Sequence, residues 1–72
     1  SVEIAPNPAK DFFTVKSAKE VESIEIMNIA GQTLSVNDGD TTVEISLAAG
    51  TYIVKIVTED GEVHVKRLNV RQ

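Results

Sequence analysis

Apolar and polar side chains alternate along most of this chain, and no helix-length stretch carries apolar residues at the spacing i, i+3, i+4 and i+7. Alternation with period two places successive side chains on opposite faces of an extended strand. Valine, isoleucine and threonine, which strands favour, are frequent in the same stretches. The sequence therefore predicts an all-β protein.

Turn residues divide this pattern into about seven short strands. We expect them at residues 2–4, 12–16, 23–29, 32–36, 42–47, 51–58 and 62–70. Such spacing is typical of an immunoglobulin-like β-sandwich with antiparallel strands and Greek-key connections. Residues 17–22 are the only helix-like piece and are predicted to be a loop, because so short a helix is not stable alone.

Length and charge exclude several classes of protein. With 72 residues the chain can bury only one core, so residues 1–72 are expected to form one domain. The net charge of −4 repels nucleic acid. No apolar run is long enough to span a bilayer, no signal sequence leads the chain, and no cysteine is present. Because the first residue is Ser1, we expect a processed product or a piece of something longer.

Two short motifs mark where strands end. Asp60-Gly61 separates the two longest strand patterns and predicts a two-residue type I′ turn. Pro6 and Pro8 cannot donate hydrogen bonds to a sheet, so they are expected to end the first strand and to hold Asn7 extended.

The apolar residues of the last predicted strand change from odd positions, at Val63 and Val65, to even positions, at Leu68 and Val70. A regular ladder from the two-residue turn would place Arg67 opposite Val54 on an apolar face. One extra residue near Lys66 and Arg67 restores that face, so we expect a β-bulge there. The predicted core side of the hairpin is Tyr52, Val54, Ile56, Val63, Val65, Leu68 and Val70.

The only histidine, His64, could form a catalytic triad with Ser35 or Ser46 and Asp60. Its parity is opposite to that of Val63, which places it on the predicted solvent face of a strand, where no pocket excludes water. We therefore expect no catalytic residues, and the domain itself is not expected to be an enzyme.

Carboxylates gather in two clusters, which makes calcium the sharpest metal hypothesis. The clusters are Asp38, Asp40 and Glu44, and Glu59, Asp60 and Glu62. Neither has the ligand spacing of a calcium loop, and turn geometry explains the glycine in each. We expect no metal site and no cofactor.

Basic residues collect at the end of the chain, at Lys66, Arg67 and Arg71. They either protect a solvated strand edge from aggregation or form a docking strip for an acidic partner. Phe12 and Phe13 are adjacent in one strand, so one ring is expected in the core and the other near the surface.

Four segments in order carry a family resemblance: residues 5–12 (APNPAKDF), 24–32 (IEIMNIAGQ), 47–56 (LAAGTYIVKI) and 65–68 (VKRL). Together they resemble the type A C-terminal sorting domain of the type IX secretion system, over nearly the whole chain. The chain departs from this pattern at Met27, where an aromatic residue is common, and in a tail that continues to Gln72. The matching positions are Pro6, Asn7, Pro8, Gly31, Gly50, Tyr52 and the terminal strand with Lys66, Arg67, Leu68, Val70 and Arg71.

The resemblance implies a signal at the end of a larger protein secreted by certain Gram-negative bacteria. The precursor passes through the periplasm, and the outer-membrane translocon recognises the folded domain. A surface sortase-like peptidase then typically removes the domain and joins the cargo to lipopolysaccharide at the cell surface. The matching positions would be the recognition residues, and the domain would be a substrate rather than an enzyme.

We expect residues 51–72 to be the main docking surface, where a partner adds a strand and the basic residues steer it. Two other functions remain open: an adhesive or carbohydrate-binding module, and a structural spacer beside a catalytic domain. Few aromatic residues, 4% of the chain, speak against the carbohydrate-binding module. Exposed strand edges could also let two copies dimerise.

Overall fold

The computed structural model describes residues 1–72 and contains seven strands and no helix. The strands are β1 (Val2–Ala5), β2 (Phe12–Ser17), β3 (Val21–Met27), β4 (Thr33–Asp38), β5 (Thr42–Glu44), β6 (Gly50–Thr58) and β7 (Val63–Val70). The all-β prediction is confirmed. Only β5 is much shorter than expected, because residues 45–49 already cross towards the other sheet. The loop predicted at residues 17–22 is confined to residues 18–20.

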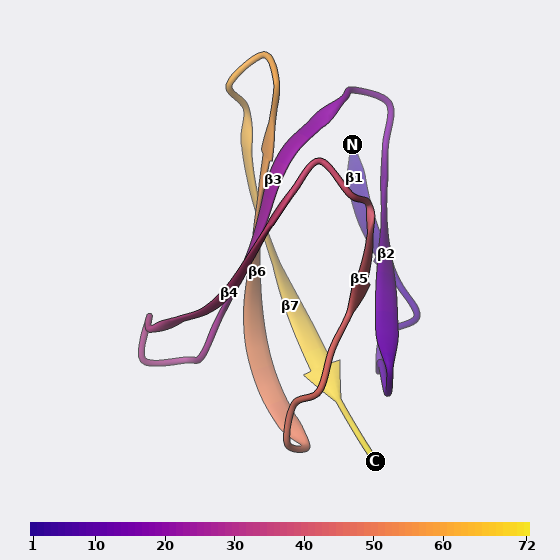
Figure 1. Ribbon diagram of the computed structural model, residues 1–72, viewed down its shortest axis with the longest axis vertical. Helices are drawn as coiled ribbons and strands as arrows, with labels where there is room; N and C mark the ends of the chain where they lie inside the picture. Colours follow the sequence, from indigo (N-terminus) through magenta and orange to yellow (C-terminus); the bar gives the residue numbers. More distant parts are fainter.

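Two antiparallel sheets face each other (Figure 1), with strand orders β1-β2-β5 and β4-β3-β6-β7. Hairpins join β1 to β2, β3 to β4 and β6 to β7, and the chain crosses between sheets after β2, β4 and β5. This is the predicted immunoglobulin-like sandwich with Greek-key crossovers. The fold has no helix that could cross a membrane.

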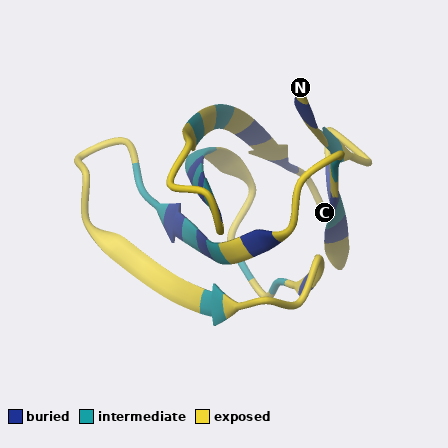
Figure 2. Cartoon of the chain, turned by 90° about the horizontal axis from the view of Figure 1, so that it is seen from above, coloured by how far each residue is buried: buried dark blue, intermediate teal, exposed yellow.

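The core lies between the sheets and contains 12 buried apolar residues. Phe13 and Ile56 are among its largest fully buried side chains. Phe12, on the opposite face of the same strand, is 46% exposed, as predicted. Figure 2 shows β4 exposed along almost its whole length, because this outer strand of the four-stranded sheet has no covering layer.

The turn between β6 and β7 differs from the prediction. Thr58 donates its N–H to the carbonyl of Glu62 at 3.0 Å, so residues 59–61 form a longer loop than the predicted pair. Gly61 has a φ of 91°, and no other type of residue in the chain has a positive φ. Asp60 therefore cannot take the conformation that a type I′ turn requires. Its carboxylate bonds the hydroxyl of Thr58 instead, which organises the longer loop.

The predicted bulge near Lys66 and Arg67 is also wrong. β7 pairs with β6 without interruption, and Lys66 lies opposite Val54 on the inner face. Val63 and Val65 consequently lie on the outer face, where they are 56% and 61% exposed. The three-residue loop shifts the pairing of β7 by one residue from the predicted register, which changes the faces without a bulge. The inner face near the turn, which projects past the three-stranded sheet (Figure 1), therefore carries the half-buried His64 and Lys66.

The rest of the predicted hairpin core is confirmed. Val54, Ile56, Leu68 and Val70 are buried, and Tyr52 packs against them half-buried. Sequence parity assigned the wrong faces only in the half of β7 nearest the turn.

Candidate functional site

The proline loop, residues 6–11, joins β1 to β2 and lies against the edge of β7 that does not pair with β6. The side chain of Asn7 donates from Nδ2 to the carbonyl of Arg67 at 2.9 Å. Its Oδ1 accepts the backbone N–H of Asn69, also at 2.9 Å. One amide side chain thus occupies two backbone groups of β7.

Ala9 continues this contact. Its N–H donates to the carbonyl of Asn69 at 2.8 Å, and its carbonyl accepts the N–H of Arg71 at 2.9 Å. Ala9 is fully buried beside Val70, with which it forms a parallel bridge. The proline loop therefore covers the edge of β7 from residue 67 to residue 71.

The other half of this edge has no hydrogen-bonding partner within the chain. Backbone groups of alternate residues in an antiparallel strand point to the same side. Since those of Asn69 point away from β6, those of Val63, Val65 and Arg67 do so as well. The N–H and carbonyl groups of the two valines and the N–H of Arg67 form no hydrogen bond within the chain. Residues 63–67 are called the open edge below.

Most predicted site residues gather at the end of the sandwich where the proline loop lies. Gly50 pairs with Val70 and Tyr52 with Leu68. The hydroxyl of Tyr52 donates to the carbonyl of Ala48 at 2.6 Å, which ties β6 to the preceding loop. The flanking prolines, Pro6 and Pro8, are exposed, whereas Leu68 and Val70 are buried.

Gly31 is the exception. It lies in the β3–β4 turn, two strands away from β7, with a φ of 88° and its N–H bonded to the carbonyl of Asn28 at 3.0 Å. Its place is explained by that turn, since a left-handed conformation favours glycine.

The basic residues of β7 and the tail lack acidic partners. Lys66 is half-buried, Arg67 and Arg71 are exposed, and none of the three takes part in an ion pair. They are three of only seven lysines and arginines in a chain of net charge −4. This strip is therefore locally positive on an acidic protein.

At the turn, Lys19 from the β2–β3 loop contacts two carboxylates. Its Nζ lies 2.8 Å from Asp60 and 2.7 Å from Glu62. The Lys19 ammonium, with help from the Thr58 hydroxyl, holds the pKa of Asp60 at about 2. Lys19 also lowers the pKa of Glu62, and the hydrogen bond from His64 lowers it further. Both carboxylates in turn raise the pKa of Lys19. These contacts fix the turn against the β2–β3 loop.

The predicted solvent-face position of His64 is wrong, because it lies opposite Ile56 on the inner face. Its side chain contacts Glu62 Oε1 at 3.3 Å and no serine. No three histidine, aspartate or glutamate side chains lie close enough together to bind a metal ion. Two carboxylates of the second acidic cluster bind Lys19 instead.

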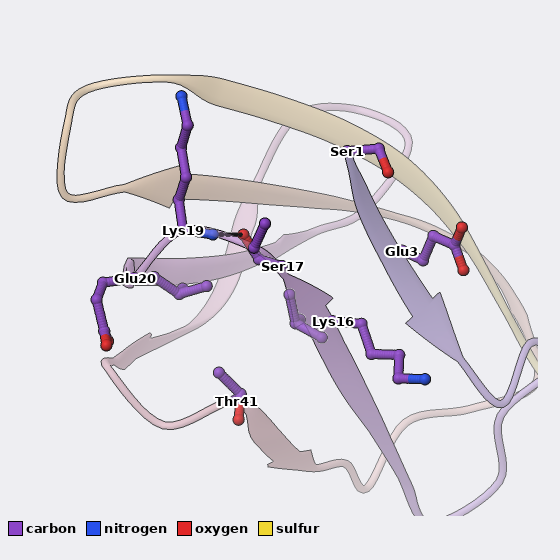
Figure 3. A pocket seen from close by; sticks show the side chains of 10 residues that line it. Ser1, Glu3, Lys16, Ser17, Lys19, Glu20 and Thr41 are labelled. Carbon is purple, nitrogen blue, oxygen red and sulfur yellow. Dashed lines mark hydrogen bonds between the residues drawn. The ribbon is translucent and has the colours of Figure 1, made fainter.

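A groove of about 650 Å³ lies between the start of β1 and the β2–β3 loop. Figure 3 shows that Lys16, Lys19 and Glu20 on its rim point away from one another. The hydroxyl oxygen of Ser17 accepts a hydrogen bond from the backbone N–H of Lys19 at 3.1 Å. The groove therefore offers no converging set of side chains for a small ligand.

Sequence reasoning missed Ala9 and Asn69, although one or both take part in three of the four hydrogen bonds that join the proline loop to residues 67–71. It also missed the exposure of Val63 and Val65. The change of parity on β7 was a usable signal, but it was interpreted as a bulge. No local pattern in one sequence indicates that a loop near residue 7 contacts a strand near residue 69.

Comparison with known proteins gives one match. The sequence model of a family described as the secretion system C-terminal sorting domain matches residues 3–71. The match includes the proline loop and all of β7. Neither the curated proteins nor the solved structures contain a match to this chain.

Proposed function

Because the chain belongs to the family of secretion system C-terminal sorting domains, which are signals for type IX secretion, we propose that β7 and the proline loop form the surface read by the outer-membrane translocon. Such a signal implies a fused cargo, contact with the secretion machinery, and export through the envelope to the cell surface or beyond. The observation that carries the proposal is the hydrogen bonding of Asn7 and Ala9 to β7, which joins both ends of the matched sequence into one surface.

The finer steps of the route are also proposals. Residues 1–72 act as one folded sorting domain at the end of a periplasmic precursor. The translocon recognises the domain in its folded state. A surface peptidase then removes it as the cargo is attached to lipopolysaccharide, so the domain is a substrate and not a catalyst.

The site residues differ in exposure and in the part they play. Pro6, Pro8, Arg67 and Arg71 are exposed and can touch a partner. The half-buried or buried positions Tyr52, Leu68 and Val70 shape the strand from within. Gly50 and Gly31 set the backbone at a strand start and at a turn, and Lys66 adds charge to the strip.

A reporter fusion tests this function. Residues 1–72 are fused to the C-terminus of an unrelated periplasmic reporter and expressed in a host with an active type IX system. We expect the reporter outside the cells, and we expect it to stay in the periplasm when the same host lacks the translocon. A reporter retained in both hosts would refute a sorting function.

No observation in the structure supports either alternative function. Carbohydrate-binding sandwiches present exposed aromatic rings. Here Phe13 is buried and the hydroxyl of Tyr52 is bonded to Ala48, which leaves Phe12 as the exposed ring. A role as spacer predicts no particular contact between the proline loop and β7.

A further inference from the structure

The open edge of β7 has the features of a site for strand addition. It presents a row of unpaired backbone donors and acceptors at Val63, Val65 and Arg67. Exposed strand edges in native proteins are usually covered, bulged, interrupted by proline or protected by charged side chains, and Lys66 and Arg67 are the charges on this edge. β7 is covered by the proline loop only as far as Arg67 and contains no bulge.

The side chains around the open edge suit a partner strand. Val63 and Val65 stand more than half exposed on the outer face, where Val63 lies opposite Val57 of β6 and Val65 opposite Lys55. A strand paired with β7 would place every second side chain next to these valines. Apolar residues at those positions would bury surface that the fold leaves in water.

Charge indicates what the other residues of that strand should be. Lys66 stands on the inner face, between the positions of Val65 and Arg67, and has no acidic partner. Opposite charges on neighbouring strands stabilise pairing, whereas like charges weaken it. A partner strand with acidic residues between its apolar ones complements this edge.

A second copy of the chain complements it less well. Antiparallel self-pairing centred on Val65 would place Lys66 of each copy opposite His64 of the other and would bring both Arg67 side chains into the joint. Glu62, which precedes the open edge in the chain, is already bound to Lys19.

We propose that the secretion machinery docks by adding a short extended strand, alternately apolar and acidic, to residues 63–67, and that the proline loop blocks the rest of β7 and so fixes the register of that strand. This inference rests on the proposed sorting function. It assigns Asn7 a positioning role, since its amide closes the edge where the open part ends.

The first test uses the wild-type chain and a short capped peptide in which valine and glutamate alternate. Amide hydrogen exchange is followed by NMR. We expect the peptide to slow exchange of the Val63, Val65 and Arg67 amides but not of the β4 amides, and we expect a valine–lysine peptide to have no effect. Equal protection by both peptides, or by neither, would overturn the proposal. Protection that rises with protein concentration without peptide would assign the edge to a second copy instead.

The second test uses the reporter fusion. V65P removes an N–H that the fold does not use, and proline is tolerated on strand edges, whereas V65T keeps that N–H. Circular dichroism and thermal melting check that both variants fold. We expect export to be lost with V65P and retained, though reduced, with V65T. Full export of a folded V65P fusion would refute strand addition but not the sorting function. Failure of the wild-type fusion to be exported would refute the sorting function itself. If V65P does not fold, the peptide experiment still decides.

Discussion

Asn69 donates its backbone N–H to the side-chain oxygen of Asn7 at 2.9 Å, although the two residues are 62 positions apart in the chain. The nitrogen of the same side chain donates to Arg67 at 2.9 Å. The proline motif is therefore part of the last strand's structure, and changes at either end of the chain should affect the same surface.

Replacing Asn7 with aspartate should destabilise the fold. The introduced carboxylate can accept from Asn69 but cannot donate to the carbonyl of Arg67, so we expect a loss of about 1–2 kcal/mol at neutral pH, measured by urea unfolding. The loss should shrink under acid, because a protonated carboxyl can donate again. N69A is the matched control, since it removes only the side-chain contact with Thr51 and keeps the backbone donor. Equal losses in N7D and N69A would contradict this account.

Gly61 should tolerate substitution poorly. Its φ of 91° costs a side chain about 1–2 kcal/mol, although its surroundings are open. G61A should therefore lower the midpoint of urea unfolding, and G61N should lower it less, because asparagine adopts this conformation more readily. If alanine were the milder of the two, the left-handed conformation would not be the cause.

The Lys19 contacts predict a pH dependence. Folding lowers the pKa of Asp60 from 3.8 to about 2 and also lowers that of Glu62. A carboxyl group whose pKa is lowered by folding stabilises the fold at pH values above its pKa in the unfolded chain. This contribution disappears as the pH falls through its pKa in the folded chain. The melting temperature of wild type should thus exceed that of K19M at pH 6, and the two should converge near pH 2. A constant difference across that range would be inconsistent with these ion pairs. Because all three groups are exposed, the effect should be small and weakened by salt.

Valine-to-threonine substitutions test the faces of β7. V65T should change the free energy of unfolding by less than about 0.5 kcal/mol, because the side chain is exposed. The buried control V70T should cost about 1–3 kcal/mol, since it places a hydroxyl in the core. Urea unfolding of both variants gives the comparison. A large loss in V65T would support the bulged register, in which Val65 faces the core, against the regular pairing of β7.

Period-two alternation was sufficient to predict the seven strands, and it correctly separated Phe12 from Phe13. It failed at Val63 and Val65, because these apolar residues face solvent, whereas alternation alone places apolar residues towards the core. These valines carry the proposed docking surface, and local rules are often broken at functional sites. The contact between Asn7 and β7 was beyond prediction, since it depends on how two distant segments meet in space.

The most direct test measures how much reporter is exported by a host with type IX secretion. The reporter is fused to the wild-type chain, to N7D or to N69A, and folding of each fusion is confirmed at the growth temperature. We predict that N69A is exported like wild type and that N7D is retained, because only N7D loosens the proline loop from β7. Export of N7D at the wild-type level, with its loop shown by amide exchange to have left β7, would contradict the claim that these two segments form the sorting signal together.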